Sequence, residues 1–355
     1  MFIIPKPTMK AFCEWPFVRA KININGDVTM CCYQDTFIGN IFNQSLEKIW
    51  NCDEAVDVRN TTLQNKLHKK CLTWGGCPYL NTDLTDKEYT FSYTKRLPTE
   101  IEIDLPSRHC NIGGLNPSDK NPACLMCPRD SKKYRKSVSF NADHTQRIIE
   151  AVKPYMWNLT KLCILGVAEP FWKGIVFDIL DYLEFQKYKD KILFWTFTNG
   201  SVFNKEVVNK FLEYTDRTEI YCSIDAGTKE TYQKIRRRDF FELIKKNLIY
   251  YNSVRGMRNR LIINANINTI NMHEMAQMVE FTAVVGADQL VMNPTHNCAG
   301  TMDDVVEQEL LITRENMNVF ESYFQQAQKR AQELGVNLHL YRTFQQVTSS
   351  LPILG

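Results

Sequence analysis

The sequence lacks a hydrophobic run long enough to cross a membrane. No apolar stretch approaches the roughly 18–20 residues that a transmembrane helix needs. The apolar start at residues 1–4 is interrupted by Pro5 and Pro7, and it is shorter than the core of a signal peptide, about 7–15 residues. We therefore expect no contact with a membrane and a cytoplasmic location, where thiols remain reduced.

The sequence also lacks a strong excess of charge of either sign. It has 43 lysine and arginine residues against 40 aspartate and glutamate residues, for a net charge of +3 at pH 7. Such a balance does not indicate a nucleic-acid-binding or membrane-surface protein. Internal repeats and low-complexity tracts are missing as well. The hydrophobic content of 44% and the aromatic content of 12% instead indicate a well-packed globular protein.

The 355 residues exceed what one simple core usually holds, about 250–300. After residue 98 predicted strands alternate with helical segments, and this alternation indicates a parallel sheet. The strands are expected at 100–105, 162–166, 192–197, 219–225, 261–267 and 289–293. These roughly 200 residues are fewer than the ~250 typical of a closed eight-stranded barrel. The expected fold class is therefore α/β, a partial (β/α)6 TIM-like barrel with a small N-terminal, cysteine-rich α+β metal-cluster domain.

We expect three domains, at residues 1–97, 98–300 and 301–355, the last being a C-terminal helix and strand that pack on the barrel. In the first domain the pattern around an Asn-Gly-Asp turn at 25–27 predicts a β-hairpin. Ser45 is the expected N-cap of a short helix. In the barrel, Asn271 and Glu274 are expected to form a capping-box-like pair. The apolar spacing over 317–334, followed by Gly335, predicts a long amphipathic helix near the end.

Twelve cysteines in a reducing compartment indicate metal ligands more than disulfides. Cys110, Cys124 and Cys127 follow the first predicted barrel strand, at the strand end where barrel enzymes assemble their active sites. An iron–sulfur cluster held by three thiolates keeps one iron open for a further ligand. The alternative is a zinc site completed by His109 or another residue. Three other cysteines are expected to be buried apolar side chains: Cys163, Cys222 and Cys298.

From residue 99 to residue 300 the chain resembles a radical S-adenosylmethionine (SAM) enzyme. The three cysteines are followed in order by GVAEP, TNG and SIDAGTKETYQKIRR, which are similar to motifs of that family, and NINTINMHEM and GADQLVMNP resemble its fifth and sixth strand regions. Two departures are a spacing between the first two cysteines ten residues longer than the family's commonest one, and Ala168 where glycine is usual.

The resemblance implies that Cys110, Cys124 and Cys127 are the catalytic ligands of a 4Fe-4S cluster. It also implies a set of SAM-binding residues: Gly166, Glu169, Thr198, Asn199, Ser223, Asp225 and Arg236. In this set Glu169 would accept the ammonium group of SAM, the residues Asn199, Ser223 and Asp225 would bind ribose hydroxyls, and Arg236 would pair with the carboxylate. The alternatives are polar packing in the barrel core for Ser223 and Asp225, and a solvated basic face for Arg236.

A second group of cysteines, Cys13, Cys31, Cys71 and Cys77, resembles the SPASM module, an auxiliary cluster-binding extension of radical SAM enzymes. Gly26 and Cys31 have the module's Gly-x4-Cys spacing, so Cys31 is preferred over Cys32 as a ligand. In the family this module usually follows the barrel, whereas here it precedes it. Four thiolates suit a second 4Fe-4S cluster, and zinc is the alternative.

The implied reaction is reductive cleavage of SAM by the reduced 4Fe-4S cluster, which yields a 5′-deoxyadenosyl radical that abstracts a hydrogen from a substrate. A peptide or protein is the expected substrate because SPASM-bearing relatives commonly modify them. A small metabolite, sugar or nucleotide is the second candidate. An electron donor such as a flavodoxin or a ferredoxin is the expected partner. The hypothesis from another class is a non-catalytic iron–sulfur or zinc protein.

Overall fold

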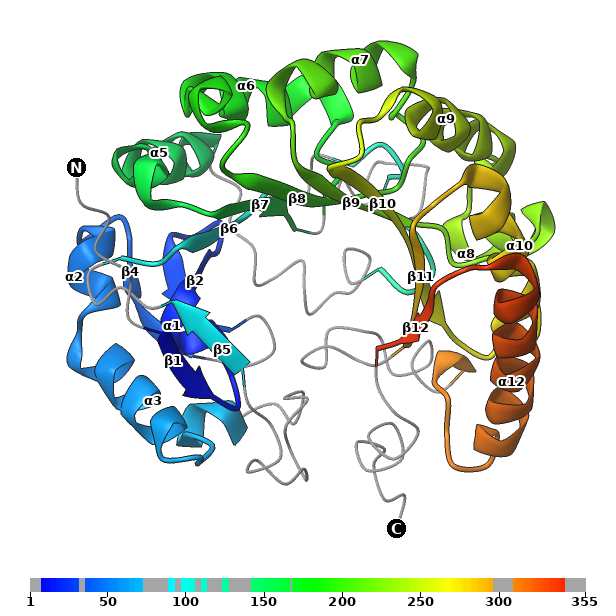
Figure 1. Cartoon of the computed structure of the whole chain (residues 1–355), viewed down its shortest axis with the longest axis horizontal. Helices are drawn as coiled ribbons and strands as arrows, with labels where there is room; N and C mark the ends of the chain where they lie inside the picture. Colours follow the sequence, from blue (N-terminus) through cyan, green and yellow to red (C-terminus); the bar gives the residue numbers. More distant parts are fainter. Residues whose placement is uncertain are drawn as a thin grey trace. The chain divides into compact units, whose positions relative to one another are not determined.

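The computed structural model (Figure 1) describes a defined part of the chain, with the other residues left out: 8–31, 36–72, 89–92, 97–105, 110–113, 123–127, 142–166, 168–295 and 309–341. The chain divides into two compact units. Unit 1 comprises residues 1–106, 140–166 and 179–193, and unit 2 comprises residues 107–139, 167–178 and 194–355. In the described residues no helix has the length and apolar content that a membrane span requires.

Unit 1 contains the N-terminal elements and the first two strands of the barrel. Its elements are β1 (Thr8–Ala11), α1 (Trp15–Val18), β2 (Arg19–Ile22), β3 (Asp27–Thr29), β4 (Phe37–Asn40), α2 (Leu46–Trp50), α3 (Asp53–Leu63), β5 (Tyr89–Ser92), β6 (Glu100–Asp104), α5 (Ala142–Val152) and β7 (Lys161–Leu165). Short 3-10 turns lie at Lys69–Leu72, Lys153–Asn158 and Phe185–Tyr188. The helix α6 (Ile175–Tyr182) begins in unit 2 and ends in unit 1.

The main sheet of unit 1 has the strand order β7-β6-β2-β3-β4. The strands β6 and β7 are parallel, and β2 pairs in parallel with β6 on its other side. The strands β2 and β3 form the predicted antiparallel hairpin, whose turn places Gly26 at a φ of 81°. The expected helix at Ser45 is also confirmed, because the Ser45 hydroxyl accepts the Lys48 N–H as the N-cap of α2. The N-terminal hairpin thus belongs to the same sheet as the first barrel strand.

Alternating charges join β2 to β6. Arg19 lies opposite Glu100 in the parallel register and pairs with its carboxylate at 3.1 Å. Glu102 is buried and pairs with both Arg19 at 3.8 Å and Lys21 at 3.0 Å. Lys21 also contacts Asp104 at 3.2 Å. Because Glu102 is buried between two cations, its charge is compensated inside the sheet, and each side chain of this ladder depends on its neighbours.

Unit 2 contains the remaining barrel strands and the C-terminal helix. Its elements are β8 (Leu193–Thr198), α7 (Lys205–Tyr214), β9 (Thr218–Ser223), α8 (Lys229–Arg236), α9 (Phe241–Val254), β10 (Asn259–Ile267), α10 (Met275–Val285), β11 (Gln289–Pro294), α12 (Met317–Leu334) and β12 (Leu338–Leu340), with 3-10 turns at Trp172–Gly174 and Met272–Glu274. The strands follow the order β12-β11-β10-β9-β8 and all pair in parallel.

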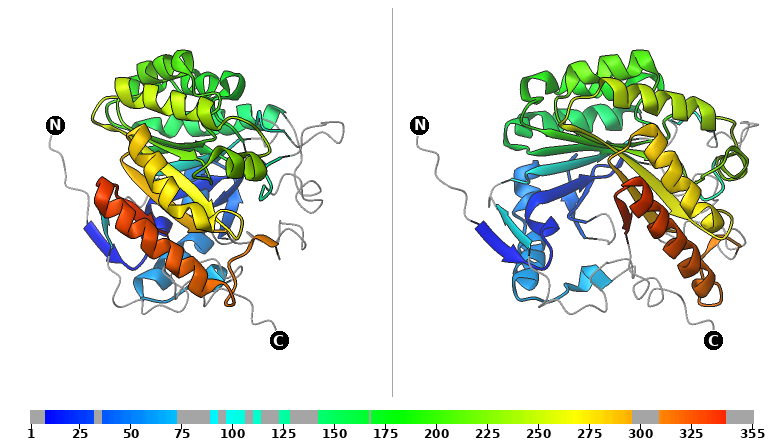
Figure 2. Two further views of the ribbon diagram at one scale, coloured as in Figure 1. Left: turned by 90° about the vertical axis from the view of Figure 1, so that its right-hand side faces the viewer. Right: turned by 45° about the vertical axis from the view of Figure 1, so that its right-hand side comes forward.

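The predicted alternation of six strands with helices is confirmed, and with it the fold class of a partial barrel carrying an N-terminal α+β region. The predicted last helix is α12, which ends at Gly335 with a φ of 67°. It packs beside α10 (Figure 2), and β12 extends the sheet next to β11. The apolar stripe of α12, with Phe320, Phe324 and Ala327, is buried as its spacing predicts.

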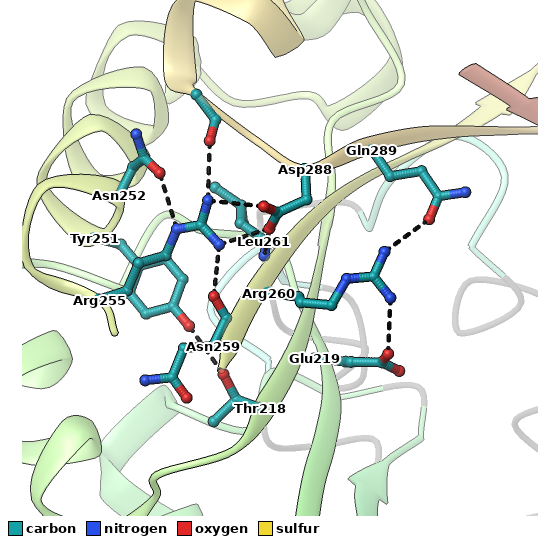
Figure 3. Close-up of polar contacts among 11 residues, drawn as sticks. Thr218, Glu219, Tyr251, Asn252, Arg255, Asn259, Arg260, Leu261, Asp288 and Gln289 are labelled. Carbon is teal, nitrogen blue, oxygen red and sulfur yellow. Dashed lines mark hydrogen bonds and ion pairs between the residues drawn. The ribbon is translucent and has the colours of Figure 1, made fainter. Parts of the chain in front are cut away.

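A network around Arg255 fastens the N-terminal ends of β10 and β11 (Figure 3). The Arg255 guanidinium donates to both carboxylate oxygens of Asp288, at 2.5 and 3.2 Å, and to the carbonyls of Asn259 and Gly286. The Asp288 carboxylate also accepts the Leu261 N–H at 2.7 Å. In barrel enzymes this end of the strands serves stability. We therefore read this network as structural.

Candidate functional site

The cysteine segment after β6 is described at residues 110–113 and 123–127. Cys124 is buried, whereas Cys110 and Cys127 are half-buried. The Cys127 N–H donates to the Cys124 carbonyl at 2.9 Å, so these two cysteines lie in one tight turn. Their ligand role stays a prediction. The expected burial of Cys163 and Cys222 is confirmed, and Cys298 lies outside the described residues.

Glu169 is fully buried at the carboxyl end of β8. Its Oε1 accepts the Thr198 hydroxyl at 2.7 Å and the Phe171 N–H at 3.3 Å, and its Oε2 accepts the Asn199 N–H at 2.6 Å. Burial raises the pKa of Glu169 to about 7, although these hydrogen bonds lower it. The predicted residues Glu169, Thr198 and Asn199 are therefore brought together. A buried carboxylate oriented in this way suits the recognition of an ammonium group.

The side chain of Asn199 is held by two residues that the sequence analysis did not single out. Its Nδ2 donates to Asn111 Oδ1 at 2.9 Å, and its Oδ1 accepts the N–H and the hydroxyl of Ser201. Asn111 in turn donates to the Ser201 hydroxyl at 2.7 Å. Asn111 directly follows Cys110, and that adjacency was the one signal in the sequence that pointed to it. The network links the cysteine segment to the end of β8.

Gly166, in unit 1, stands where the backbones of two strands approach closely. Its φ is 122°, and a Cβ placed on it would lie 2.9 Å from both the N and the O of Leu105. A side chain at this position would therefore collide with the backbone after β6. This close approach explains the glycine that begins the GVAEP segment. Its predicted contact with SAM stays a prediction.

Asp225 and Arg236 form a buried ion pair in unit 2. Asp225 has a φ of 57°, and its Oδ1 accepts the Asn266 N–H at 2.7 Å, while its Oδ2 faces the Arg236 guanidinium. The Nη1 of Arg236 lies 3.8 Å from Cys124 Sγ. The alternative that Arg236 belongs to a solvated basic face is wrong, because its side chain is 10% exposed. Ser223 ends β9 and is half-buried. The predicted SAM contacts of all three residues stay predictions.

The capping-box pair expected of Asn271 and Glu274 is not formed. The Glu274 carboxylate instead accepts the N–H groups of Gly227 and Thr228, at 2.9 and 3.1 Å, and the hydroxyls of Thr228 and Thr231, both at 2.6 Å. It thereby holds the residues at the start of α8, a different helix, whose N-cap is Thr228. Asn271 donates to the carbonyl of Asp225 at 2.8 Å. Both side chains are engaged in tertiary contacts instead. These contacts position the loop that carries Asp225.

In unit 1, the residues Cys13, Cys31 and Cys71 are half-buried, and Cys77 lies outside the described residues. Thr29 donates to the carbonyl of Cys31 at 3.2 Å, so the end of the hairpin orients that residue. Among the described residues no three of histidine, cysteine, aspartate and glutamate are grouped as ligands of one metal ion. The ligand assignments of this N-terminal group therefore stay predictions.

The residues around Cys124 fit an iron–sulfur cluster. Two buried donors, Tyr232 Oη and Arg236 Nε, have no hydrogen-bond partner among the described residues. Arg236 Nη1 lies 3.8 Å from Cys124 Sγ, and Tyr232 lies one turn earlier on the same helix, α8. Both atoms carry N–H or O–H protons, and the sulfurs of a cluster are acceptors. The Cys124 thiol and these two donors therefore match the chemistry of an anionic sulfur cluster.

Two family models match the chain. The model described as the radical SAM superfamily matches residues 105–282, half of the chain. The SPASM model, described as an iron-sulfur cluster-binding domain, matches residues 13–78. The predicted placement of this second domain before the barrel is confirmed. Curated protein sequences include no match to the chain.

Solved structures with similar folds are distant in sequence. SuiB from Streptococcus suis is 15% identical with a TM-score of 0.45, over 69% of this chain and 49% of SuiB, and SuiB bound to the precursor peptide SuiA is 13% identical with a TM-score of 0.46, over 94% and 72%. A radical SAM methyltransferase from Sphaerobacter thermophilus is 14% identical with a TM-score of 0.42, over 62% of each chain.

The chain spans about half the length of the first SuiB structure. The superfamily assignment therefore rests on the family model, which matches over the cysteine segment, the Glu169 region and the strands up to β10. A radical SAM domain implies a 4Fe-4S cluster and SAM, and the N-terminal domain is an additional iron–sulfur cluster-binding domain. This chain belongs to the radical SAM superfamily.

Proposed function

We propose that this radical SAM enzyme holds its SAM-binding cluster on Cys110, Cys124 and Cys127, and takes the ammonium group of SAM on Glu169. The observation that carries the proposal is the Glu169 carboxylate. It is fully buried, and Thr198 and Asn199 orient its two oxygens. A buried carboxylate of this kind stabilises the fold poorly by itself, because burial disfavours its charged form. A cationic ligand offsets that cost.

When bound, the cluster supplies the electron that cleaves a C–S bond of SAM. The chain's own residues orient the ligand. The ordered amide of Asn199 is fixed by Asn111 and Ser201, so the end of β8 is rigid before SAM binds. Preorganisation of this kind reduces the entropy lost on binding. We retain Asn199, Ser223 and Asp225 as the ribose side of the site, and a flavodoxin or ferredoxin in the cytoplasm as the electron donor.

We propose a peptide or protein as the substrate. One support is the N-terminal domain, which matches the SPASM model. The resemblance supports a peptide because SPASM-bearing relatives commonly modify peptides or proteins. The second is an aromatic group, Trp195, Phe197 and Tyr221, whose ring centroids lie 5.0–5.6 Å apart. Phe194 contacts Phe211 of α7, so the alternating residues Trp195 and Phe197 point to the opposite face of β8. An aromatic wall there offers an amino-acid side chain a surface to pack against.

The metal content tests the cofactor assignment. Iron, zinc and labile sulfide per chain are measured in anaerobically reconstituted protein. About eight irons and eight sulfides support two four-iron clusters. About four irons with one zinc support the radical SAM assignment and make the N-terminal group a zinc site, with the ligands Cys13, Cys31, Cys71 and Cys77. Zinc without sulfide overturns the proposal and favours a non-catalytic zinc protein. Cys124→Ala should lose one cluster, whereas the control Cys163→Ala should lose none.

The substrate class is tested by the release of 5′-deoxyadenosine. Extract of the source cells should stimulate this release when dithionite supplies the electrons. Stimulation that disappears after protease digestion supports a peptide or protein. Stimulation that survives digestion and passes a filter for small molecules overturns the peptide assignment in favour of a metabolite, sugar or nucleotide.

A further inference from the structure

Several hydrogen bonds join the C-terminal end of α8 to the cysteine segment. Two of them involve the backbone neighbours of Cys124: the Leu125 N–H donates to the Ile235 carbonyl at 2.8 Å, and Arg237 donates to the Ala123 carbonyl at 3.2 Å. A third lies near Cys110, where Arg238 donates to the Ile112 carbonyl. The helix therefore determines where the Cys124 thiol lies.

Arg236 makes the remaining contact, with the thiol itself. Its Nη1 lies 3.8 Å from Cys124 Sγ, within the range of a hydrogen bond to sulfur. Asp225 pairs with the other end of the guanidinium and is fully buried, so the orientation of Arg236 is fixed from behind. The Nε of Arg236 has no hydrogen-bond partner among the described residues. The guanidinium thus presents unused donor capacity next to a predicted cluster ligand.

Tyr232, one turn earlier on α8, presents a second unused donor. Its side chain is 0% exposed, and its hydroxyl has no hydrogen-bond partner in the part of the chain that the structure describes. It lies on the same helix as Arg236, whose Nη1 is 3.8 Å from Cys124 Sγ. A buried hydroxyl without a partner destabilises a fold. The unpartnered Tyr232 hydroxyl, one turn before Arg236, therefore points to an acceptor that the polypeptide does not supply.

We propose that Tyr232 and Arg236 donate hydrogen bonds to the sulfurs of the cluster on Cys110, Cys124 and Cys127 and thereby raise its reduction potential. This inference rests on the proposed function. Addition of an electron increases the negative charge on the cluster, and donors that face the sulfurs stabilise that charge. These hydrogen bonds from Tyr232 and Arg236 therefore make the one-electron reduction of the cluster by a flavodoxin- or ferredoxin-type donor more favourable.

The test is Tyr232→Phe, which removes only the hydroxyl. The midpoint potential is measured anaerobically by a dithionite titration followed by electron paramagnetic resonance, using the signal that changes when SAM is added. We expect a more negative potential and an unchanged or higher melting temperature, because the hydroxyl has no protein partner to lose. The matched control is Tyr251→Phe. Tyr251 is equally buried but pairs with Thr218 at 3.0 Å (Figure 3), so its change should lower the melting temperature and leave the potential unchanged.

Arg236→Lys is the second variant. Lysine keeps the positive charge next to Asp225 but has a single, compact donor group. A larger negative shift of the potential than in Tyr232→Phe is the expected result. An unshifted potential in both variants, with the cluster assembled, overturns this inference and leaves the proposed function standing. A wild-type protein that assembles no cluster overturns both, and the iron and sulfide content distinguishes the two outcomes.

Discussion

The backbone N–H of Asn199 donates to Oε2 of Glu169 at 2.6 Å and thereby connects the end of β8 with the segment that follows β7. A hydrogen bond to an ionised group contributes about 1.5–3 kcal/mol. The carboxylate is therefore placed before any ligand arrives, and the remaining lone pairs are available to a cation.

Glu169→Gln should weaken SAM binding by about 10- to 100-fold, because a neutral amide replaces the carboxylate that faces the ammonium group. Calorimetric titration of the reconstituted protein with SAM at pH 8 measures the change. The control is Glu213→Gln on the exposed face of α7, where affinity should not change. Equal affinities for the wild type and Glu169→Gln would remove Glu169 from the SAM site.

The stability of the wild type should fall relative to Glu169→Gln as the pH rises. The pKa of Glu169 is about 7 in the folded protein and 4.5 as an ordinary carboxyl group, so between these values the folded state binds more protons than the unfolded state. Stability is therefore greatest below pH 4.5 and is lost as the pH rises to 7. From pH 6 to pH 8 the free energy of unfolding should drop by about 1 kcal/mol relative to the variant. Urea unfolding at the two pH values measures this, and a constant difference would contradict it.

Glu274→Ala should lower the free energy of unfolding by about 2–4 kcal/mol, because it leaves the N–H groups of Gly227 and Thr228 and two threonine hydroxyls without their acceptor. Urea or thermal unfolding measures the loss. Glu280→Ala on α10, the helix that follows Glu274, is the control. Its ion pair with Arg330 is exposed, and exposed pairs contribute about 0–1 kcal/mol. Similar losses in both variants would contradict this role of Glu274.

Arg255→Lys should lower the melting temperature without changing the affinity for SAM, since one ammonium group cannot reach all the acceptors of the guanidinium fork. The cost should be about 1–3 kcal/mol. Arg260→Lys is a matched control (Figure 3), because Arg260 pairs separately with Glu219, is 44% exposed, and should change the melting temperature little. A loss of SAM affinity in Arg255→Lys would show that this end of the sheet contributes to the site.

Local patterns in the sequence were enough to predict the strands, the hairpin and α12. Each depends on short-range features: apolar periodicity, the Asn-Gly turn, or Gly335 as a stop. The motif order also predicted that Glu169, Thr198 and Asn199 would meet. These features survive in the structure because packing and local preference favour the same conformation.

Partners that are distant in the sequence could not be predicted. Glu274 was expected to cap its own helix, but Thr228 and Thr231 offer it more donors from α8. Nothing in the local pattern of Asp225 showed that Arg236 and the Asn266 N–H would engage its oxygens. Side-chain competition of this kind is decided by the tertiary fold and not by spacing.

The pairing of β2 with β6 has a consequence for any attempt to isolate the barrel. A fragment that begins near residue 97 would lose β2, and one side of β6 would become an exposed edge strand with unpaired N–H and C=O groups. It would also carry Glu102 without Arg19 and Lys21. Such edges template strand addition between molecules. We therefore expect β2 to keep this edge of the barrel from pairing with other molecules.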